Sequence, residues 1–447
     1  MSEAVTTRQQ ELAGKYRPYP EYKDSGVVWL GEMPSTWVLA KTARYFKIAM
    51  GQTILKEQLE DDGEWPVYSA TEGDHYFGRV NNPQVRLGCG DLVIPARGNS
   101  IGFVKLVKEQ VTTTQTTIYC KHLTQKIYPE YAYYFMVGQK ENLFWFTQTA
   151  IPQITVEEIG SNPILLPSFE EQRTIAAFLD YETAHIDRLI AQQQRLIELL
   201  KEKRQAVISH AVTKGLNPKA PMKDSGVEWL GQVPEHWVIS PLKYKCVFSG
   251  GGTPSKDNLE YWNGSIPWVS PKDMKSFWIT DAEDKITEQA IKESSTKLVQ
   301  PGAVLMVVRS GILQRTIPVG MNTIPVTMNQ DMKAIRFSSA VYAEWLSFFI
   351  KGYEDSLLLD WRKQGATVES IEHEYLANSL MLFPPEEEAR SIIAALGRRL
   401  DKFDQLEQRA SDAITLLQER RTALISAAVT GKIDLRGWTP PAEEVAA

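Results

Sequence analysis

The sequence lacks any run of about eighteen apolar residues, so we expect no segment that spans a membrane. Its opening stretch, MSEAVTTRQQELAG, lacks the basic and then apolar order of a secretory signal, which predicts a cytoplasmic protein. Cysteine is scarce, with three scattered residues at Cys89, Cys120 and Cys246. An odd number without CxxC spacing suits a reducing compartment and argues against a disulfide framework or a paired-CxxC zinc site.

Signatures of common catalytic sites are also missing. The stretch SGGGTPSK (249–256) has glycines, but not the GxxxxGK[ST] spacing that places a lysine and a hydroxyl on phosphate and Mg²⁺. The six histidines never form HExxH, and no GxSxG elbow is present. NNPQ, beginning at Asn81, does not match the N-P-P-aromatic motif of amino-methyltransferases. We therefore expect no catalytic residue, no bound cofactor and no metal on this chain.

An excess of positive charge is absent as well. The chain carries 49 Lys and Arg against 55 Asp and Glu, a net charge of −6, so any DNA-binding surface has to be local. An apolar content of 43% and a charged content of 23% are typical of globular proteins. A length of 447 residues predicts two to four folded units.

The sequence does contain an internal repeat. The phrase YKDSGVVWLGEMPSTW (22–37) returns 200 residues later as MKDSGVEWLGQVPEHW (222–237). A second pair of matching segments begins with EEQRTIAAFLD at Glu170 and EEARSIIAAL at Glu387, an offset of 217 residues. The stretches between the matches share little apparent sequence. The chain therefore alternates variable and repeated blocks, and its second variable block is the longer one.

The repeated blocks at Glu170 and Glu387 have the apolar spacing of long amphipathic helices. Each begins after proline with acidic residues and ends in basic turns and a glycine, as a capped helix does. Each predicts about 40 helical residues, or ~60 Å. We expect them to pack on each other as an antiparallel pair; two separate helices, each on its own domain, are the alternative. The predicted seam residues are Ile175, Leu179, Ile186, Leu189, Leu196, Leu200 and Val207, with Ile392, Leu396, Phe403, Leu406, Ala413, Leu417 and Leu424.

The variable blocks have the pattern of mixed helix and strand. GDLVIPARG, GFVKLV and QTTIYC in the first block, and GAVLMVVRSG and MKAIRF in the second, predict short strands bounded by turn residues. PEYAYYFMVGQKENLFWF and AEWLSFFIKGYEDSLLL predict a helical stretch near the end of each block. The predicted fold is α+β, with two globular domains joined by two long helices.

One charged pattern resembles a metal-dependent nuclease site. Asp273 and Glu283 would hold Mg²⁺, and Lys285 would help to position the attacking water. However, the pattern is short, its proline is displaced by one residue, and charged tripeptides of this kind are common on solvated surfaces. We favour an exposed loop and keep a metal-dependent endonuclease as an alternative function.

Polar and basic loops beside glycines supply what DNA groove reading requires. Arginine suits guanine, Asn or Gln suits adenine, and Ser, Thr and Lys suit phosphates. The alternative for each loop is ordinary solvent-facing surface. The repeated tryptophans, Trp29, Trp37, Trp229 and Trp237, are expected to anchor the domain cores instead. The candidate DNA-binding residues are Lys56, Arg79, Arg97, Asn99, Lys105 and Gln115 in the first block, and Ser255, Lys256, Lys272, Arg309, Gln314, Arg315, Asn329, Gln330, Arg362 and Lys363 in the second.

Taken together, the repeated segments resemble the specificity (S) subunit of Type I restriction–modification systems. The resemblance lies in KDSGVVWLGEMPSTW and KDSGVEWLGQVPEHW, and in the helix openings PSFEEQRTIAAFLD and PPEEEARSIIAAL. The helix ends RQAVISHAVTKGL and RTALISAAVTGKIDLRGW also match. These motifs cover essentially the whole chain in the family's order.

This resemblance implies target recognition domains at 22–166 and 217–383, each reading one half of a bipartite site in double-stranded DNA. It implies conserved helical spacers at 167–216 and 384–437, packed as an antiparallel coiled coil with internal two-fold pseudo-symmetry. Residues 1–21 and 438–447 are then an N-terminal extension and a C-terminal tail. Two methyltransferase (modification) subunits and restriction/translocase subunits are the implied partners, and they would carry S-adenosylmethionine, ATP and Mg²⁺. A coiled-coil scaffold that binds only protein is a further alternative.

Overall fold

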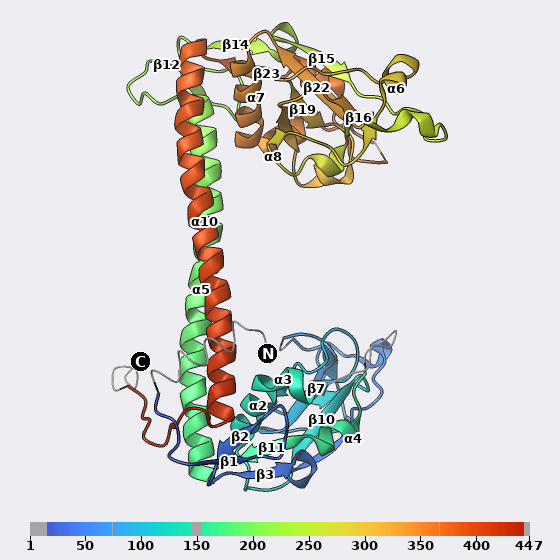
Figure 1. Cartoon of the computed structure of the whole chain (residues 1–447). Coiled ribbons are helices and arrows are strands. Elements are labelled where there is room, and N and C mark those ends of the chain that lie inside the picture. The colour runs from blue at the N-terminus through green and yellow to red at the C-terminus, as the bar shows by residue number, and fades with distance from the viewer. Residues whose placement is uncertain (1–15, 74, 145–152, 366, 442–447) are drawn as a thin grey trace. The chain divides into compact units, whose positions relative to one another are not determined.

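The computed structural model describes residues 16–73, 75–144, 153–365 and 367–441 (Figure 1). The chain divides into two compact units, unit 1 (Met1–Gln194 with Ser411–Ala447) and unit 2 (Arg195–Ala410). Each unit contains one globular domain and a half of each long helix. Parts of the predicted extension and tail, 1–15 and 442–447, and the end of the first predicted helical stretch lie outside the described residues. None of the described helices has the length and apolar character needed to cross a membrane.

Unit 1 contains a domain built on two small sheets. The larger sheet has the order β4-β10-β7-β8, with β4 (Phe46–Met50), β10 (Thr117–His122), β7 (Leu92–Pro95) and β8 (Lys105–Leu106) all antiparallel to their neighbours. The smaller sheet has the order β6-β5-β9, with β6 (Gly78–Val80), β5 (Trp65–Tyr68) and β9 (Thr112–Thr113). Two ribbons pair β1 (Tyr22–Asp24) with β2 (Glu32–Pro34), and β3 (Val38–Lys41) with β11 (Pro163–Leu166). The short helices are α2 (Pro129–Gly138), α3 (Lys140–Leu143), α4 (Val156–Ser161), η1 (Thr42–Arg44) and η2 (Lys56–Gln58).

Unit 2 contains a domain of the same kind. Its larger sheet has the order β15-β22-β19-β20-β17, with β15 (Cys246–Gly250), β22 (Met332–Phe337), β19 (Val304–Val307), β20 (Val319–Asn322) and β17 (Trp278–Ile279). The smaller sheet joins β18 (Lys285–Ile286), β16 (Trp262–Val269) and β21 (Thr327–Met328), and the ribbons pair β12 (Met222–Asp224) with β13 (Gln232–Pro234) and β14 (Val238–Pro241) with β23 (Leu380–Phe383). The helices are α6 (Glu288–Glu293), α7 (Ala340–Gly352), α8 (Glu354–Trp361), α9 (His373–Asn378), η3 (Leu242–Tyr244), η4 (Leu259–Tyr261), η5 (Pro271–Asp273) and η6 (Gly311–Gln314).

The strands predicted from apolar runs are confirmed. LVIP and VLMV form β7 and β19, in which every residue is buried, because each strand has a neighbour on both sides and is covered on both faces. QTTIYC and MKAIRF supply β10 and β22, which pair with β7 and β19 respectively. The predicted α+β class is therefore confirmed for both domains.

The two domains share one topology although their sequences differ. In unit 1, β10 lies between β4 and β7, and β5 is antiparallel to β6 and parallel to β9. In unit 2, β22 lies between β15 and β19, and β16 is antiparallel to β18 and parallel to β21. A Cβ atom added at Gly51 would lie 2.2 Å from the Thr114 carbonyl oxygen, and one at Gly251 would lie 1.9 Å from that of Asn329. Both positions therefore require glycine for the same close approach.

The long helices are α5 (Phe169–Lys214) and α10 (Glu386–Val429), and within each unit they pack antiparallel, as predicted. In unit 1, the Arg421 Nε atom lies 2.9 Å from an Asp187 carboxylate oxygen, and in unit 2, Arg204 pairs with Asp404. Residue numbers therefore rise along α5 in the direction in which they fall along α10. α10 ends at Val429, and the chain continues beyond it as a nonhelical segment.

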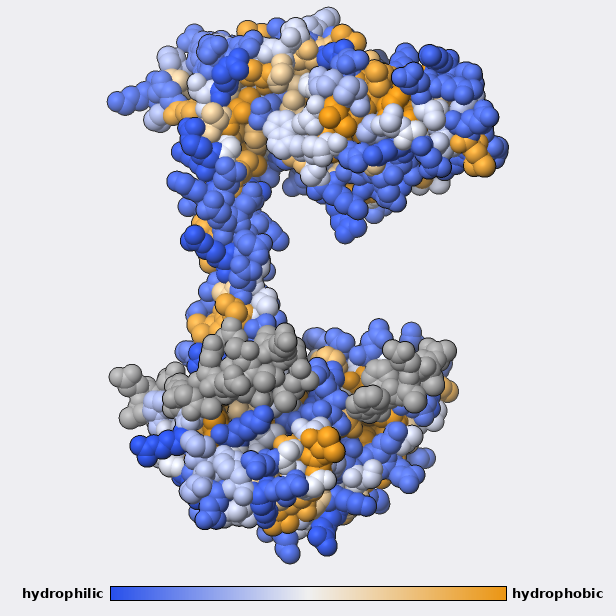
Figure 2. All heavy atoms as spheres, viewed as in Figure 1, coloured by the Kyte–Doolittle hydropathy of each residue, from blue (hydrophilic) through white to orange (hydrophobic). Residues whose placement is uncertain are grey.

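The predicted seam is buried only in part. Ile175, Leu179, Ile392 and Leu396 are buried where the helices also contact a domain. In contrast, Leu196 and Leu406 of unit 2 are 41% and 43% exposed. Figure 2 shows small apolar groups among the hydrophilic residues on the visible face of the helix pair. Where the two helices pack only on each other, some seam residues such as Leu196 and Leu406 remain in contact with solvent.

The repeated phrase forms a short ribbon in each unit. Asp24 accepts a hydrogen bond from the Gly26 backbone N–H at 2.9 Å, and Asp224 accepts one from Gly226 at 2.9 Å. Both glycines have positive φ angles, 72° and 70°, which glycine adopts without strain. The tryptophan that ends the phrase is fully buried in both copies, so its prediction as a core anchor is confirmed. Trp29 and Trp229 are half-buried and pack against the same two cores.

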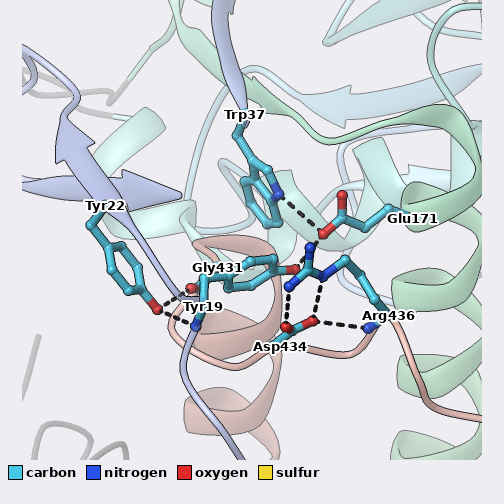
Figure 3. Close-up of polar contacts among 7 residues, drawn as sticks. All are labelled: Tyr19, Tyr22, Trp37, Glu171, Gly431, Asp434 and Arg436. Atoms are coloured by element: carbon cyan, nitrogen blue, oxygen red, sulfur yellow. Dashed lines mark hydrogen bonds and ion pairs between the residues drawn. The ribbon is translucent and has the colours of Figure 1, made fainter. Parts of the chain in front are cut away.

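In unit 1, a polar network joins segments from distant parts of the sequence (Figure 3). Glu171, in the first turn of α5, accepts hydrogen bonds from the Tyr19 hydroxyl at 2.5 Å and from Trp37 Nε1 at 3.2 Å. Burial, and then the bond to Glu171, raises the pKa of Tyr19 above its ordinary value. Asp434 and Arg436, beyond the end of α10, form an ion pair at 2.5 Å. The Asp434 N–H also donates to the Arg17 carbonyl oxygen at 2.7 Å, which ties residues after α10 to residues before β1.

Candidate nucleic-acid interface

In unit 2, three loops meet at one end of the larger sheet. The loops after β15 and β19 and the loop before β22 meet because β22 runs antiparallel to both neighbours. Thr253 is hydrogen-bonded to Gln330, and Arg309 Nε donates to Asp331 Oδ1 at 2.6 Å. The segment after α8 joins them, since the Ser310 N–H donates to the carbonyl of residue 369 at 3.0 Å.

The loops that meet here, the η6 turn and the segment after α8 carry every predicted residue of the second block except Lys272, which lies in η5. The loop after β15 contains Ser255 and Lys256, and the loop before β22 contains Asn329 and Gln330. The remaining residues are in the loop and η6 turn after β19 or the segment after α8, and these are Arg309, Gln314, Arg315, Arg362 and Lys363.

Unit 1 has the equivalent loop cluster. The loops after β4 and β7 and the loop before β10 meet at one end of its larger sheet, because β10 runs antiparallel to both neighbours. Lys56, Arg97, Asn99 and Gln115 lie on these loops and are exposed. Arg79 lies on β6, where its Nε donates to the Gly63 carbonyl at 2.5 Å, outside the cluster.

Most cations in the unit 2 cluster are held by carboxylates. Arg362 pairs with Glu369, and Lys363 Nζ lies 3.4 Å from a Glu372 oxygen. Among the described residues, no ion pair or hydrogen bond engages the exposed side chains of Lys256 and Arg315. Opposed charges at this separation fix the side chains but contribute little to stability at a solvated surface.

Two predicted DNA-binding residues are buried instead. Lys105 is 2% exposed, and its Nζ donates to Thr71 Oγ1 at 3.3 Å and to the Gly73 carbonyl. Asn329 is 7% exposed, and its side chain bonds Asp331 through Oδ1 and Nδ2. Lys105, on β8, holds the segment at Thr71 and Gly73, and Asn329 holds its own loop, so in this conformation neither side chain is available to a DNA groove. The Asn-x-Asp sequence is a turn signal that anticipates the second case, whereas nothing in the sequence marks the first.

The residues of the nuclease-like pattern do not converge as a metal site. Asp273 accepts bonds from the Ser270 N–H at 2.8 Å and the Glu283 N–H at 2.9 Å, so its carboxylate organises a turn. Lys285 pairs with Asp281 at 3.1 Å. No group of three or more His, Cys, Asp or Glu side chains that could hold a metal occurs in the part of the chain that the structure describes. The geometry gives the endonuclease alternative no support.

A duplicated α+β domain with variable polar loops, mounted on an antiparallel helix pair, defines a two-domain recognition protein. The family model for the Type I restriction modification DNA specificity domain matches residues 34–199 and 234–416. The chain belongs to this family, whose role is DNA sequence specificity, and the resemblance found in the sequence is confirmed.

Particular relatives agree with this membership. The chain is 36% identical over 195 residues to the Type I restriction enzyme EcoR124I/EcoR124II specificity subunit of Escherichia coli, over 43% of this chain and 44% of the relative. The match thus spans less than half of that relative's length. Among solved structures, one titled "Structural basis underlying complex assembly and conformational transition of the type I R-M system" has a TM-score of 0.70 at 16% identity, over 89% of this chain and 98% of the other. The HsdS subunit from Thermoanaerobacter tengcongensis has a TM-score of 0.52 at 16% identity, over 90% and 98%. These two likenesses establish the fold.

Proposed function

We propose that this chain gives a Type I restriction–modification complex its sequence specificity, each domain reading one half of a bipartite site in double-stranded DNA. The observation that carries the proposal is the pair of equivalent loop clusters. Domains of one topology present different polar side chains from the same end of the same sheet. Sequence is read through such side chains at base edges, so different clusters suit different half-sites.

The proposed contacts are the exposed residues of the two clusters. Arg79 and Lys272 stay predictions outside the clusters, and the buried Lys105 and Asn329 are assigned to loop structure. The proposed set is Lys56, Arg97, Asn99 and Gln115 in unit 1, and Ser255, Lys256, Arg309, Gln314, Arg315, Gln330, Arg362 and Lys363 in unit 2.

The paired helices have two proposed roles: they set the distance between half-sites, and they dock the other subunits. α5 has 46 residues, a length of ~69 Å at 1.5 Å per residue. The repeated framework around both helices suits two identical methyltransferase subunits, and restriction/translocase subunits complete the assembly. S-adenosylmethionine, ATP and Mg²⁺ act on those partners, and the complex works in the cytoplasm.

Exchange of one domain tests bipartite reading. Replacing residues 22–166 with the matching domain of a relative is expected to change one half of the methylated site. The framework on both sides of this block is repeated, so the second domain keeps its own structure. Sequencing of methylated DNA from cells carrying the chimaera and its partners measures the outcome, with the reciprocal exchange of residues 217–383 as the control. A change in both half-sites from one exchange contradicts separate reading.

Lengthening a helix tests the spacing role. Four residues inserted after Gln193 add ~6 Å at 1.5 Å per residue, a little under two base pairs of ~3.4 Å. Four residues also exceed one helical turn of ~3.6 only slightly, so the helix pair is expected to survive with some loss of stability. The expected result is unchanged half-site bases with a longer spacer. If the spacer in the sequenced methylated sites is unchanged, the helices do not set the distance between the half-sites.

A further inference from the structure

One arginine of the unit 2 cluster is held in a manner suited to reading a base. Arg309 is the second residue after β19, and its side chain is 54% exposed. Its Nε donates to Asp331 Oδ1 at 2.6 Å. Among the described residues, no bond or ion pair engages its two terminal nitrogens. The carboxylate therefore fixes the plane of the guanidinium and leaves the outer edge of its fork available.

The carboxylate that holds Arg309 is itself fixed. Asp331 Oδ2 accepts from Asn329 Nδ2 at 3.3 Å, and the Asp331 N–H donates to Asn329 Oδ1 at 3.0 Å. The Asn329 N–H in turn donates to the Val269 carbonyl at 2.9 Å, and the Asn329 carbonyl lies so close to Gly251 that no side chain would fit there. The support therefore extends from the sheet to the arginine.

The same place in the unit 1 domain also holds an arginine, Arg97. The residue before Arg97 donates its N–H to the Thr116 carbonyl at 2.9 Å, and the residue before Arg309 donates to the Asp331 carbonyl at 2.8 Å. Each arginine also forms an isolated β-bridge, with Gln153 and Ser370 respectively. Two domains with little shared sequence thus present arginine at one equivalent position, and Thr116 stands where the second domain has its aspartate.

The other basic residues of the unit 2 cluster do not present a fixed and open fork. Arg315 has no partner among the described residues that would fix the plane of its guanidinium. Arg362 uses a terminal nitrogen for its ion pair with Glu369, so its fork is occupied. Lys363 and Lys256 are point charges without a planar fork. A carboxylate beside Arg309 also disfavours a phosphate contact, because two anions would then share one cation, whereas a guanine base is neutral.

We propose that Arg309 determines specificity by donating its two terminal nitrogens to O6 and N7 of a guanine, and that Asp331 is a positioning residue that fixes the fork. The inference rests on the proposed DNA-reading function and goes further, because it requires a G·C pair in the half-site read by the second domain. Bidentate arginine–guanine pairs discriminate against a wrong base by about 5- to 150-fold. The equivalent Arg97, which has Thr116 at the place of the aspartate, is expected to discriminate less.

The test measures binding by the complete complex with its methyltransferase partners. The probes are duplexes carrying the methylated site identified by sequencing, and the same duplexes with 7-deazaguanine at each guanine of the second half-site. This change removes only the N7 acceptor, so the unaltered protein is expected to lose affinity at one position. Arg309→Ala removes the side chain and is expected to abolish discrimination at that pair, whereas Arg309→Lys keeps the charge without the planar fork and is expected to reduce it. Asp331→Asn is expected to reduce it while the thermal midpoint stays unchanged.

The matched control is Arg336→Ala, an exposed arginine on β22 outside the loop cluster, which is expected to change nothing. A half-site without guanine, or equal loss of affinity for every sequence in Arg309→Ala, overturns the assignment and leaves the proposed function standing. Unaltered discrimination in Asp331→Asn and Asp331→Ala overturns the positioning role. Failure of the unaltered complex to prefer its own site over random DNA removes the proposed function together with the inference.

Discussion

In each unit, the ribbon of the repeated phrase packs against the end of a long helix, but the two units connect ribbon and helix in different ways. In unit 2, the chain runs directly from the end of α5 at Lys214 into β12 at Met222. In unit 1, the equivalent helix end belongs to α10, and the equivalent ribbon begins at Tyr22, far away in the sequence. Covalent continuity therefore makes the junction in unit 2, and noncovalent contacts of side chains and backbone make it in unit 1.

The polar contacts differ accordingly. In unit 1, the buried Glu171 accepts from both Tyr19 and Trp37. Its counterpart by the repeat, Glu388, instead lies 2.7 Å from His236 Nε2 at a partly exposed position. Trp237 Nε1 is buried and has no hydrogen-bond partner among the described residues. In unit 2, the chain itself connects the helix to the ribbon, so the junction does not depend on a hydrogen bond from this tryptophan. In unit 1, the junction is noncovalent, and the bonds to Glu171 hold the residues before β1.

Substituting the two glutamates separately is expected to give the largest difference between the units in the free energy of unfolding. Glu171→Ala leaves two buried donors unpaired, at about 1–3 kcal/mol each, so a loss of about 2–6 kcal/mol in the free energy of unfolding is expected. Glu388→Ala removes a partly exposed pair worth about 0–1 kcal/mol. Urea denaturation measures both, and hydrogen exchange at residues 16–41 and 216–241 locates the loss. Glu171→Gln, which keeps an acceptor, serves as the control; equal losses for the two alanine variants contradict the comparison.

Replacing each buried tryptophan with phenylalanine isolates one hydrogen bond. The lost volume is the same at both positions. Trp37→Phe also removes a donor bonded to a carboxylate, whereas Trp237→Phe removes a donor that has no partner. The free energy of unfolding is expected to fall further in Trp37→Phe, by about 2 kcal/mol. The double variant Trp37→Phe with Glu171→Ala tests the coupling, since additive effects in the denaturation curves would show that the two groups do not interact.

Much of this architecture is predictable from the sequence, because long periodic helices and a repeated phrase are local signals. LVIP and VLMV identify the central strands from their continuous apolar character alone. The common topology of the two domains is not visible in the sequence, because strand order depends on backbone pairing that different residues satisfy. The exposure of Leu196 and Leu406 also escaped prediction, since a heptad pattern does not reveal whether a third layer covers the seam.

The candidate interface is also predictable from the sequence only in part. Exposed loop residues such as Arg309 and Lys256 follow from residue type and from neighbouring glycines. The role of Asp331 does not, because its contact with Arg309 joins two loops that only the folded sheet brings together. Lys105 is a second case of this kind, since the basic side chain is buried against Thr71 and Gly73, 34 and 32 residues away in the sequence, and no composition rule anticipates these contacts. Distances between loops, rather than residue types, distinguish the exposed residues proposed to read DNA from the residues that support a loop.

A smaller difference separates the turns that follow the two long helices. In unit 1, Asp434 accepts from the Arg436 N–H at 3.1 Å; in unit 2, Asn217 accepts from the Lys219 N–H at 3.0 Å. The two turns have the same form, but only the first has a charged acceptor, the Asp434 carboxylate. The hydrogen bond from the Arg436 guanidinium lowers the pKa of Asp434 below its ordinary value, against the opposing effect of burial.

Asp434→Asn therefore converts the charged turn into its neutral counterpart and keeps the backbone bond. Because the folded-state pKa of Asp434 is depressed, its contribution is present above the unfolded value of about 3.9 and disappears as the pH falls through the folded value. The contribution is expected to be below about 1 kcal/mol, since the Arg436 side chain is 47% exposed. Urea denaturation of both proteins at pH 7 and at successively lower pH is expected to show a small deficit in the variant that vanishes in acid. Asn217→Asp, which leaves unit 1 untouched, is the matched control. A deficit in Asp434→Asn that persists at the lowest pH would assign the effect to packing of the turn rather than to its ion pair.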